Sequence, residues 1–224
     1  MTARPAFPLV ISGPSGVGKT TVVNWLLEHV PTMRLSVSCT TRPQRGQEIE
    51  GVDYFFLEEA EFLRRRDRGE FVEWALVHGN LYGTPAAFLD RHVQEGKIVL
   101  LDIDVQGAMQ IREARRDAVL VFLLPPNLAT LSGRLRGRHT DAEDVIERRL
   151  QNAVREMRTA TGYDYIVVND DIDATCSVVE SIVCAEQASA RRILAMSSVR
   201  AQEILTEVGL IAPEDNVTHK MEKP

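Results

Sequence analysis

Residues 13–20 of this chain read Gly13-Pro14-Ser15-Gly16-Val17-Gly18-Lys19-Thr20. This stretch matches the phosphate-loop template, a glycine-rich turn that ends in Lys and a hydroxyl residue. A short apolar run at 9–11 precedes it, and apolar residues at helical spacing follow over 20–30. A strand, a glycine loop and a helix in this order direct free backbone N–H groups and the positive end of the helix at a phosphate. The sequence therefore predicts a site for the polyphosphate of a nucleotide, with Mg²⁺.

Within this loop, glycines allow the backbone to wrap phosphates closely, and Lys19 reaches the β- and γ-phosphates. The Thr20 hydroxyl is predicted to bind Mg²⁺, partly through water. A second acidic motif follows the apolar run 98–101, where Asp102 and Asp104 stand near the end of a predicted strand. A plain turn at the end of a strand would also explain these acids. Because a phosphate loop precedes them, Asp104 is predicted as a possible further metal ligand.

Composition narrows the class of protein. The chain has 224 residues, 44% of them hydrophobic, which supports a packed core and excludes a disordered protein. The net charge of −6 gives no general attraction to nucleic acid or to an anionic membrane, so neither is expected as a partner. Three cysteines are too few for a disulfide framework and fit a reducing compartment. We expect a soluble cytoplasmic protein without a membrane span.

Apolar runs and helical patterns alternate along most of the chain. Nearly continuous runs of Val, Ile and Leu predict strands covered on both faces, with helical patterns between them. The predicted strands are 9–11, 35–38, 98–103, 119–124 and 165–168. The predicted helices are 20–30, 85–95, 107–114, 128–135 and 144–158, with one or two more over about 174–208. This alternation predicts an α/β fold with a doubly wound parallel sheet.

Two stretches depart from the alternation. Residues 37–84 are rich in turn formers, charges and aromatics, which predicts an inserted small β-containing region. Residues 134–149 mix arginines with acids, as expected of a mobile lid that closes over an anionic ligand. The predicted core then comprises 1–36, 85–133 and 150–208, and 209–224 is predicted to be a flexible tail.

The inserted region holds a candidate phosphate site of its own. Arg42 and Arg45 lie three residues apart among turn formers. Planar guanidinium groups suit the bidentate capture of a phosphate, although a lone surface Arg is more often simply solvated.

The motifs beyond the phosphate loop resemble those of the guanylate kinases. The first is Ser38-Cys39-Thr40-Thr41-Arg42-Pro43-Gln44-Arg45-Gly46, followed by Glu48, Gly51, Tyr54 and Phe56. The others are Glu73-Trp74-Ala75, Gly79-Asn80-Leu81-Tyr82-Gly83-Thr84, Leu101-Asp102-Ile103-Asp104 with Gln106-Gly107, Arg134-Leu135-Arg136-Gly137-Arg138 and Asn169-Asp170-Asp171. They cover residues 8 to about 200 in the order and spacing of that family. The resemblance implies the P-loop nucleoside monophosphate kinase type of fold, with a GMP-binding insertion and a lid.

The resemblance also implies roles for individual residues. The positions that would hold the GMP phosphate are Arg42, Arg45, Tyr54 and Tyr82, which together supply positive charge and directed donors. Glu73 would meet the guanine edge, where a carboxylate accepts from N1–H and the 2-amino group, two donors that adenine lacks. Ser38 and Thr84 match hydroxyl contacts to guanine, and Asp102 would lie beside the base. Taken alone, Glu73 could equally be an ordinary surface acid.

The arginine-rich segment resembles the lid of the family. Lys19, Arg134, Arg138 and Arg149 match residues that approach the transferring phosphates, where cationic stabilisation and positioning carry most of the catalysis. A general base is not required, because the attacking oxygen belongs to a phosphate that is already largely ionised. Arg136 and Arg148 are interpreted as ordinary solvated charges. His139 departs from the glycine common at its position in the family.

Asn169 completes the implied ATP site, together with the loop at 13–20. It matches a residue near the adenine of ATP, although Asn-Asp-Asp is also a good turn and helix cap.

The implied reaction is ATP + GMP (or dGMP) to ADP + GDP (or dGDP), with Mg²⁺ and with a homodimer as a possible assembly. A non-catalytic guanylate-kinase-like interaction module is disfavoured by the intact loop and the lid arginines. A related kinase with another phosphorylated acceptor is disfavoured by Glu73 with Ser38 and Thr84. A signalling GTPase is disfavoured because the chain has no Asn-Lys-x-Asp motif.

Overall fold

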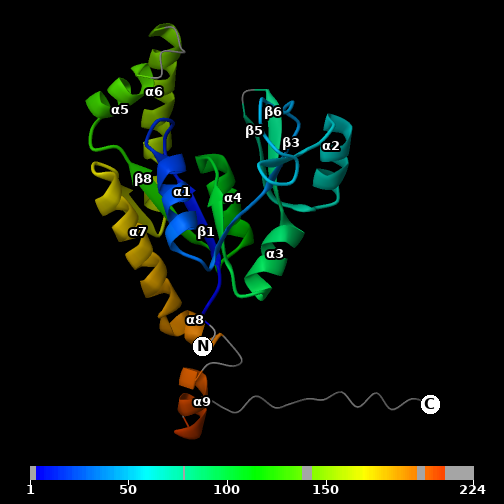
Figure 1. Ribbon diagram of the computed structural model, residues 1–224, viewed down its shortest axis with the longest axis vertical. Helices are drawn as coiled ribbons and strands as arrows, with labels where there is room; N and C mark the ends of the chain where they lie inside the picture. Colours follow the sequence, from blue (N-terminus) through cyan, green and yellow to red (C-terminus); the bar gives the residue numbers. More distant parts are fainter. Residues whose placement is uncertain (1–3, 78, 138–142, 196–199, 210–224) are drawn as a thin grey trace, which may run out of the picture. The chain divides into compact units, whose positions relative to one another are not determined.

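The main sheet has five parallel strands with the phosphate-loop strand at its centre (Figure 1). The computed structural model describes residues 4–77, 79–137, 143–195 and 200–209. Across the sheet the strands are β2 (Met33–Leu35), β7 (Ile98–Asp102), β1 (Pro8–Ser12), β8 (Val119–Leu124) and β9 (Tyr165–Val168). All the pairings are parallel, and Val10 of β1 lies opposite Leu101 of β7 and Leu120 of β8. The predicted α/β fold with a parallel sheet is therefore confirmed.

Helices cover both faces of this sheet, which is why its strands are nearly continuous in apolar residues. Leu9 and Ile11 of β1 pack with α1 (Lys19–His29) and α7 (Ile172–Gln187) in one buried cluster. Val10, which points to the other face, packs in a second cluster that includes residues of α3 and α4. These two helices and a short 3-10 helix close that face: α3 (Ala86–Gln94), α4 (Val105–Ala114) and η1 (Ala160–Gly162).

A second, four-stranded sheet occupies most of the predicted insertion. Its order is β4 (Tyr54–Phe56), β3 (Ser38–Thr40), β6 (Asn80–Pro85) and β5 (Phe71–Val77). β3 and β4 are parallel, whereas β6 runs antiparallel to both β3 and β5. The helix α2 (Glu59–Asp67) packs on it through Phe62, which is fully buried and clusters with Cys39 and Leu81.

The single strand predicted over 35–38 is wrong. β2 ends at Leu35 in the main sheet, and β3 begins at Ser38 in the small sheet. The backbone N–H of Ser36 still donates to the carbonyl of Leu100 at 2.8 Å, so the chain leaves the main sheet immediately after this contact. Apolar residues predict an extended backbone but do not reveal that consecutive residues pair in two different sheets.

Two helices lie in and beside the predicted lid. α5 (Leu128–Arg136) and α6 (Glu143–Met157) pack through a buried cluster that includes Leu131, Leu135 and Ile146. α5 extends one residue beyond the predicted 128–135, and α6 begins and ends one residue before the predicted 144–158. Arg138 and His139 lie outside the described residues.

The described residues 4–5, 184–195 and 200–209 belong to a second compact unit. Of its described residues, two stretches form α8 (Ala190–Leu194) and α9 (Arg200–Glu207), and Arg192 Nε donates to Glu186 Oε2 at 2.9 Å. The prediction of one or two helices over 174–208 is therefore corrected to α7, α8 and α9. The extended backbone of Ser189 separates the first two. Within the described ranges, every helix is too short or too polar to cross a bilayer.

We expect Leu100→Ala to lower the free energy of unfolding by about 2–5 kcal/mol, because it leaves a cavity in a fully buried strand. Urea denaturation followed by circular dichroism measures this change. The matched control is Leu128→Ala at a leucine that is 51% exposed, where we expect a loss below about 1 kcal/mol. Equal losses in the two variants would contradict this assignment of the core.

Candidate active site

The turn between β1 and α1 is shaped by glycines that no other residue could replace without strain. Gly13 and Gly18 have φ angles of 146° and 105°, in the range that L side chains rarely adopt. A Cβ atom on Gly13 would lie 2.4 Å from the carbonyl oxygen of Leu123 in β8. A Cβ atom on Gly18 would lie 2.5 Å from Nδ2 of Asn169. The loop is therefore held against the ends of neighbouring strands, with α1 beginning at Lys19.

Side chains from distant segments brace this loop. Asn169 is only 3% exposed; its Nδ2 donates to the carbonyl of Val17 at 2.7 Å and its Oδ1 accepts from Thr175 Oγ1 at 3.0 Å. Arg134 donates to the carbonyls of Val17 and Asn169, at 3.2 Å each. The structure thus places Asn169 and Arg134 in contact with the loop itself, which the sequence did not predict.

Two cavities meet at Lys19. The first has a volume of about 340 Å³, and its lining includes Ser38, Tyr54, Glu73, Tyr82 and Asp102. The second has a volume of about 550 Å³ and is lined by the glycine loop with residues of α4 and α6. Lys19, Thr20 and Asp104 line both cavities. Lys19 Nζ donates to the carbonyl of Gly13 at 2.7 Å, which holds the ammonium group beside the loop.

Glu73 is the most perturbed acid of the first cavity. It lies on β5 and is 5% exposed, and its Oε1 accepts a 2.6 Å hydrogen bond from the buried hydroxyl of Thr84 on β6. Burial raises the pKa of the Glu73 carboxyl to about 7, the negative charge of Asp104 adds to this rise, and the bond from Thr84 opposes it. Because Oε1 accepts from Thr84, Oε2 is the Glu73 oxygen through which a ligand would bind.

Asp102 and Tyr54 share the low polarity of this cavity. Burial raises the pKa of Asp102, and the nearby Lys19 ammonium lowers it in part. Burial also raises the pKa of Tyr54, so its hydroxyl remains a donor. The rings of Tyr54 and Tyr82 lie edge to face with centroids 6.0 Å apart.

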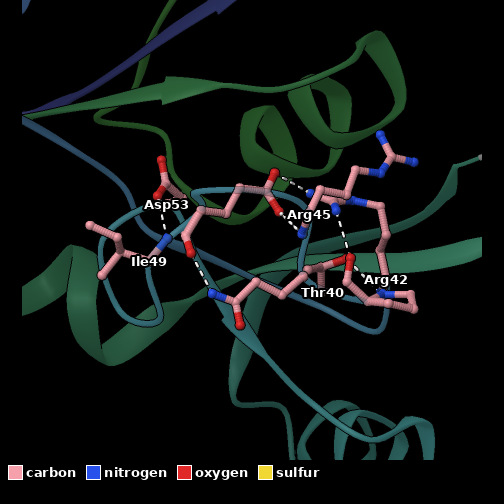
Figure 2. A network of polar contacts seen from close by, with 8 residues as sticks. Thr40, Arg42, Arg45, Ile49 and Asp53 are labelled. Carbon is pink, nitrogen blue, oxygen red and sulfur yellow. Dashed lines mark hydrogen bonds and ion pairs between the residues drawn. The ribbon is translucent and has the colours of Figure 1, made fainter.

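The Arg42 guanidinium and the Arg45 backbone are both held by a residue that was not predicted as part of the site, Glu48. Glu48 Oε1 accepts from Arg42 Nη2 at 2.7 Å, and its Oε2 accepts from the backbone N–H of Arg45 at 2.8 Å. The Arg42 guanidinium is 5.4 Å from the centre of the Tyr54 ring. The Arg45 side chain extends away from this network in Figure 2. The sequence did contain a signal for this role, because Glu48 follows Arg45 by three residues and Arg42 by six.

The remaining predicted residues fall into different groups. Thr84 is fully buried and is not among the residues that line the first cavity, but its hydroxyl donates to Glu73, which does line it. Arg45 and Arg149 line a third cavity of about 590 Å³. Arg148, interpreted from sequence as an ordinary charge, lines the same cavity. Arg138 lies outside the described residues.

The described residues contain no group of three or more His, Cys, Asp or Glu side chains arranged to hold a metal ion. Thr20 and Asp104 line both cavities and offer side-chain oxygen atoms to a ligand there. Asp104 Oδ1 accepts from the backbone N–H of Gly107 at 2.9 Å, so a metal ion would be bound through the other carboxylate oxygen.

Comparisons with known proteins place the chain in a family. A family model described as guanylate kinase matches residues 6–186. The guanylate kinase of Thermotoga maritima is 46% identical over 82% of this chain and 88% of its own length. The chain belongs to the guanylate kinase family. The guanylate kinase of Symbiobacterium thermophilum is 42% identical over 92% of this chain and 96% of its own. The crystal structure of guanylate kinase from Anaplasma phagocytophilum matches with a TM-score of 0.73 and 36% identity, covering 94% of this chain and 98% of that one.

In this guanylate kinase family member, we expect Glu73 to titrate near pH 7. A carbon-13 NMR titration of labelled carboxyl groups, assigned with Glu73→Gln, measures this pKa. Asp104→Asn removes a like charge and should lower the pKa of Glu73 while keeping the helix cap. A midpoint between pH 4 and 5 in the unsubstituted protein would contradict the burial of this carboxyl.

Proposed function

We propose that this protein transfers the γ-phosphoryl group of ATP to GMP or dGMP, which gives ADP and GDP or dGDP. Membership of the guanylate kinase family supports the reaction. The observation that carries the proposal is the buried carboxyl of Glu73, which lines a cavity that meets the phosphate loop at Lys19. The cavity along the glycine loop is then the donor site, and the cavity lined by Glu73 is the acceptor site.

Guanine selection follows from the chemistry of Glu73. An ionised carboxylate accepts from the N1–H and 2-amino groups of guanine, whereas adenine would leave a desolvated carboxylate without donors. Ser38 lines the same cavity, and Thr84 holds one Glu73 oxygen in place. Asp102, also in the lining, would lie beside the base.

The GMP phosphate is assigned to Arg42, Arg45, Tyr54 and Tyr82. Both tyrosines line the acceptor cavity. Arg42 is held against the Tyr54 ring by Glu48, so its guanidinium is oriented before any ligand arrives. Two guanidinium groups and two phenol hydroxyls would match the charge and the lone pairs of a phosphate dianion.

Transfer is assigned to Lys19 and to the lid arginines Arg134, Arg138 and Arg149. Lys19 lines both cavities and would bridge the donor and acceptor phosphates. Arg149 lines a cavity together with Arg45, which belongs to the acceptor region. We assign residues 134–149 to a lid whose closure would bring these charges onto the phosphates and exclude water. Asn169 would act on ATP through the loop that it braces.

Mg²⁺ is assigned to the junction of the two cavities. Thr20 and Asp104 offer a hydroxyl and a carboxylate there, and these hard oxygen donors fit an ion held mostly by nucleotide phosphates and water. When bound, Mg²⁺ would neutralise charge on the β- and γ-phosphates. We assign the activity to the cytoplasm, which the three free cysteines support.

The direct test measures ADP formation from ATP and Mg²⁺ with GMP, dGMP, AMP, CMP, UMP and sugar phosphates as acceptors. We expect turnover with GMP and dGMP to exceed that with AMP by several powers of ten. Turnover with another acceptor alone would identify a different kinase. Absence of GMP-dependent turnover would reject the proposal.

Glu73→Gln should lower kcat/KM for GMP about 10²–10⁴-fold, because the amide places a donor against a guanine donor. The KM for ATP should stay within about twofold of the wild type if the donor site is separate. Glu70→Gln, at an exposed acid just before β5, is the matched control. An equal loss of ATP affinity in Glu73→Gln would contradict the base-site assignment.

The pH profile provides an independent check. Because the pKa of Glu73 is raised to about 7 and guanine needs the carboxylate form, kcat/KM for GMP should fall as pH drops below 7 and level off above it. The second ionisation of the GMP phosphate has a pKa of about 6 and affects the wild type and Glu73→Gln alike. The pH profile of Glu73→Gln should therefore lose the inflection near pH 7 that belongs to Glu73 and keep the lower one that belongs to the GMP phosphate. A profile unchanged by the substitution would assign the inflection to another group.

A further inference from the structure

One face of α4 lies against β5, the strand that carries Glu73. Asp104 is the N-cap of α4, and Gly107 and Gln110 follow it at intervals of three residues. These three residues therefore lie on one side of the N-terminal half of the helix. Asp104 caps the helix by accepting from the backbone N–H of Gly107 at 2.9 Å. Helix α4 belongs to the main-sheet layer and β5 to the small sheet, so this contact joins the two.

The side chain of Gln110 forms two hydrogen bonds to the backbone of Trp74, the residue next to Glu73. Its Nε2 donates to the carbonyl of Trp74 at 2.7 Å, and its Oε1 accepts from the N–H of Trp74 at 3.1 Å. β5 is an edge strand that pairs with β6 on one side. The side-chain amide therefore satisfies both backbone groups of Trp74 on the open side, as a neighbouring strand would. This fixes the position from which Glu73 projects.

Gly107 leaves the space that the Glu73 carboxylate occupies. A Cβ atom at this position would lie 2.7 Å from Glu73 Oε2 and 3.2 Å from Glu73 Cδ. Gly107 is buried within a helix, where glycine is intrinsically less favourable than alanine. Any larger residue would displace the carboxylate, because Glu73 is itself 95% buried between Thr84 and the helix.

We propose that Gly107 and Gln110 are positioning residues for guanine recognition. Gly107 sets how closely the Glu73 carboxylate approaches α4, and Gln110 fixes the β5 backbone beside it. The inference rests on the proposed function, because it assigns these residues to the acceptor site of that reaction. It also ties the guanine-binding carboxylate to the helix whose cap, Asp104, lines the junction of the two cavities.

Gly107→Ala tests the first part, and Gly133→Ala is its matched control. Gly133 is also within a helix, and apart from the adjoining residues and backbone of its own helix a Cβ atom there would meet no atom within 4 Å. We expect Gly107→Ala to lower kcat/KM for GMP tenfold or more and to reduce the GMP-over-AMP ratio, with the KM for ATP within twofold. Gly133→Ala should change none of these. A kcat/KM for GMP in Gly107→Ala within twofold of the wild-type value would overturn this role.

Gln110→Ala tests the second part, with Glu113→Ala at an exposed position of the same helix as control. We expect the KM for GMP to rise threefold to tenfold while the KM for ATP is unchanged. A merely structural contact would lower the melting temperature and move both KM values together, and that result would overturn the positioning role. Gln110→Glu keeps the acceptor for the Trp74 N–H but sets a carboxylate against the Trp74 carbonyl, so it should not restore GMP affinity.

Failure of the proposed function gives a different result. If the wild type forms no ADP with GMP, the proposed reaction is rejected. The NMR titration of Glu73 still reports on the geometry, because Gly107→Ala should shift its pKa and Gly133→Ala should not. An unchanged Glu73 titration in Gly107→Ala would overturn the inference whatever the substrate.

Discussion

The close approach of the glycine loop to the main sheet is the constraint on which the rest of the structure depends. Gly13 leaves β1 with its Cα against the carbonyl of Leu123 in β8, a contact that leaves no room for a side chain. The turn then starts α1 at Lys19, so the backbone N–H groups of the loop and the positive end of the helix converge. Asn169 and Arg134 hold the same loop through its Val17 carbonyl. The loop that we assign to phosphate is thereby held by β1, β8 and two distant side chains.

The region that we assign to the acceptor depends on a different principle, the burial of charge. Glu73 is removed from water and keeps one strong hydrogen bond, so its pKa rises to about 7. Such a carboxyl is costly to ionise without a partner, and a ligand that brings two donors supplies that partner. Arg42 has the opposite arrangement, because Glu48 pairs with it. Thus the protein would select the base with a buried acid and hold the phosphate with the preoriented guanidinium of Arg42.

The sequence predicted the parallel sheet and the alternation of strands and helices along the chain, because apolar periodicity reflects burial on two faces. It failed at 35–38, where an extended chain passes from one sheet to another, and at the C-terminal helices, where Ser189 interrupts a helical pattern. Of the predicted acceptor residues, Ser38, Tyr54, Glu73, Tyr82 and Asp102 line one cavity. Glu48 was missed as an organiser, since its role depends on a turn that returns it to Arg42.

The sequence by itself determined the phosphate-loop motif, the family and the residue types that we assign to guanine and phosphate. These are local properties, since spacing along the chain decides them. Only the tertiary structure decided that Asn169 braces the loop, that Glu73 is buried, and that Gly107 and Gln110 of α4 support it. Glu73 and Gly107 are far apart in sequence, and no pattern within either segment encodes the distance between them. Packing of the two sheets around α4 sets that distance, and with it the environment of the carboxyl.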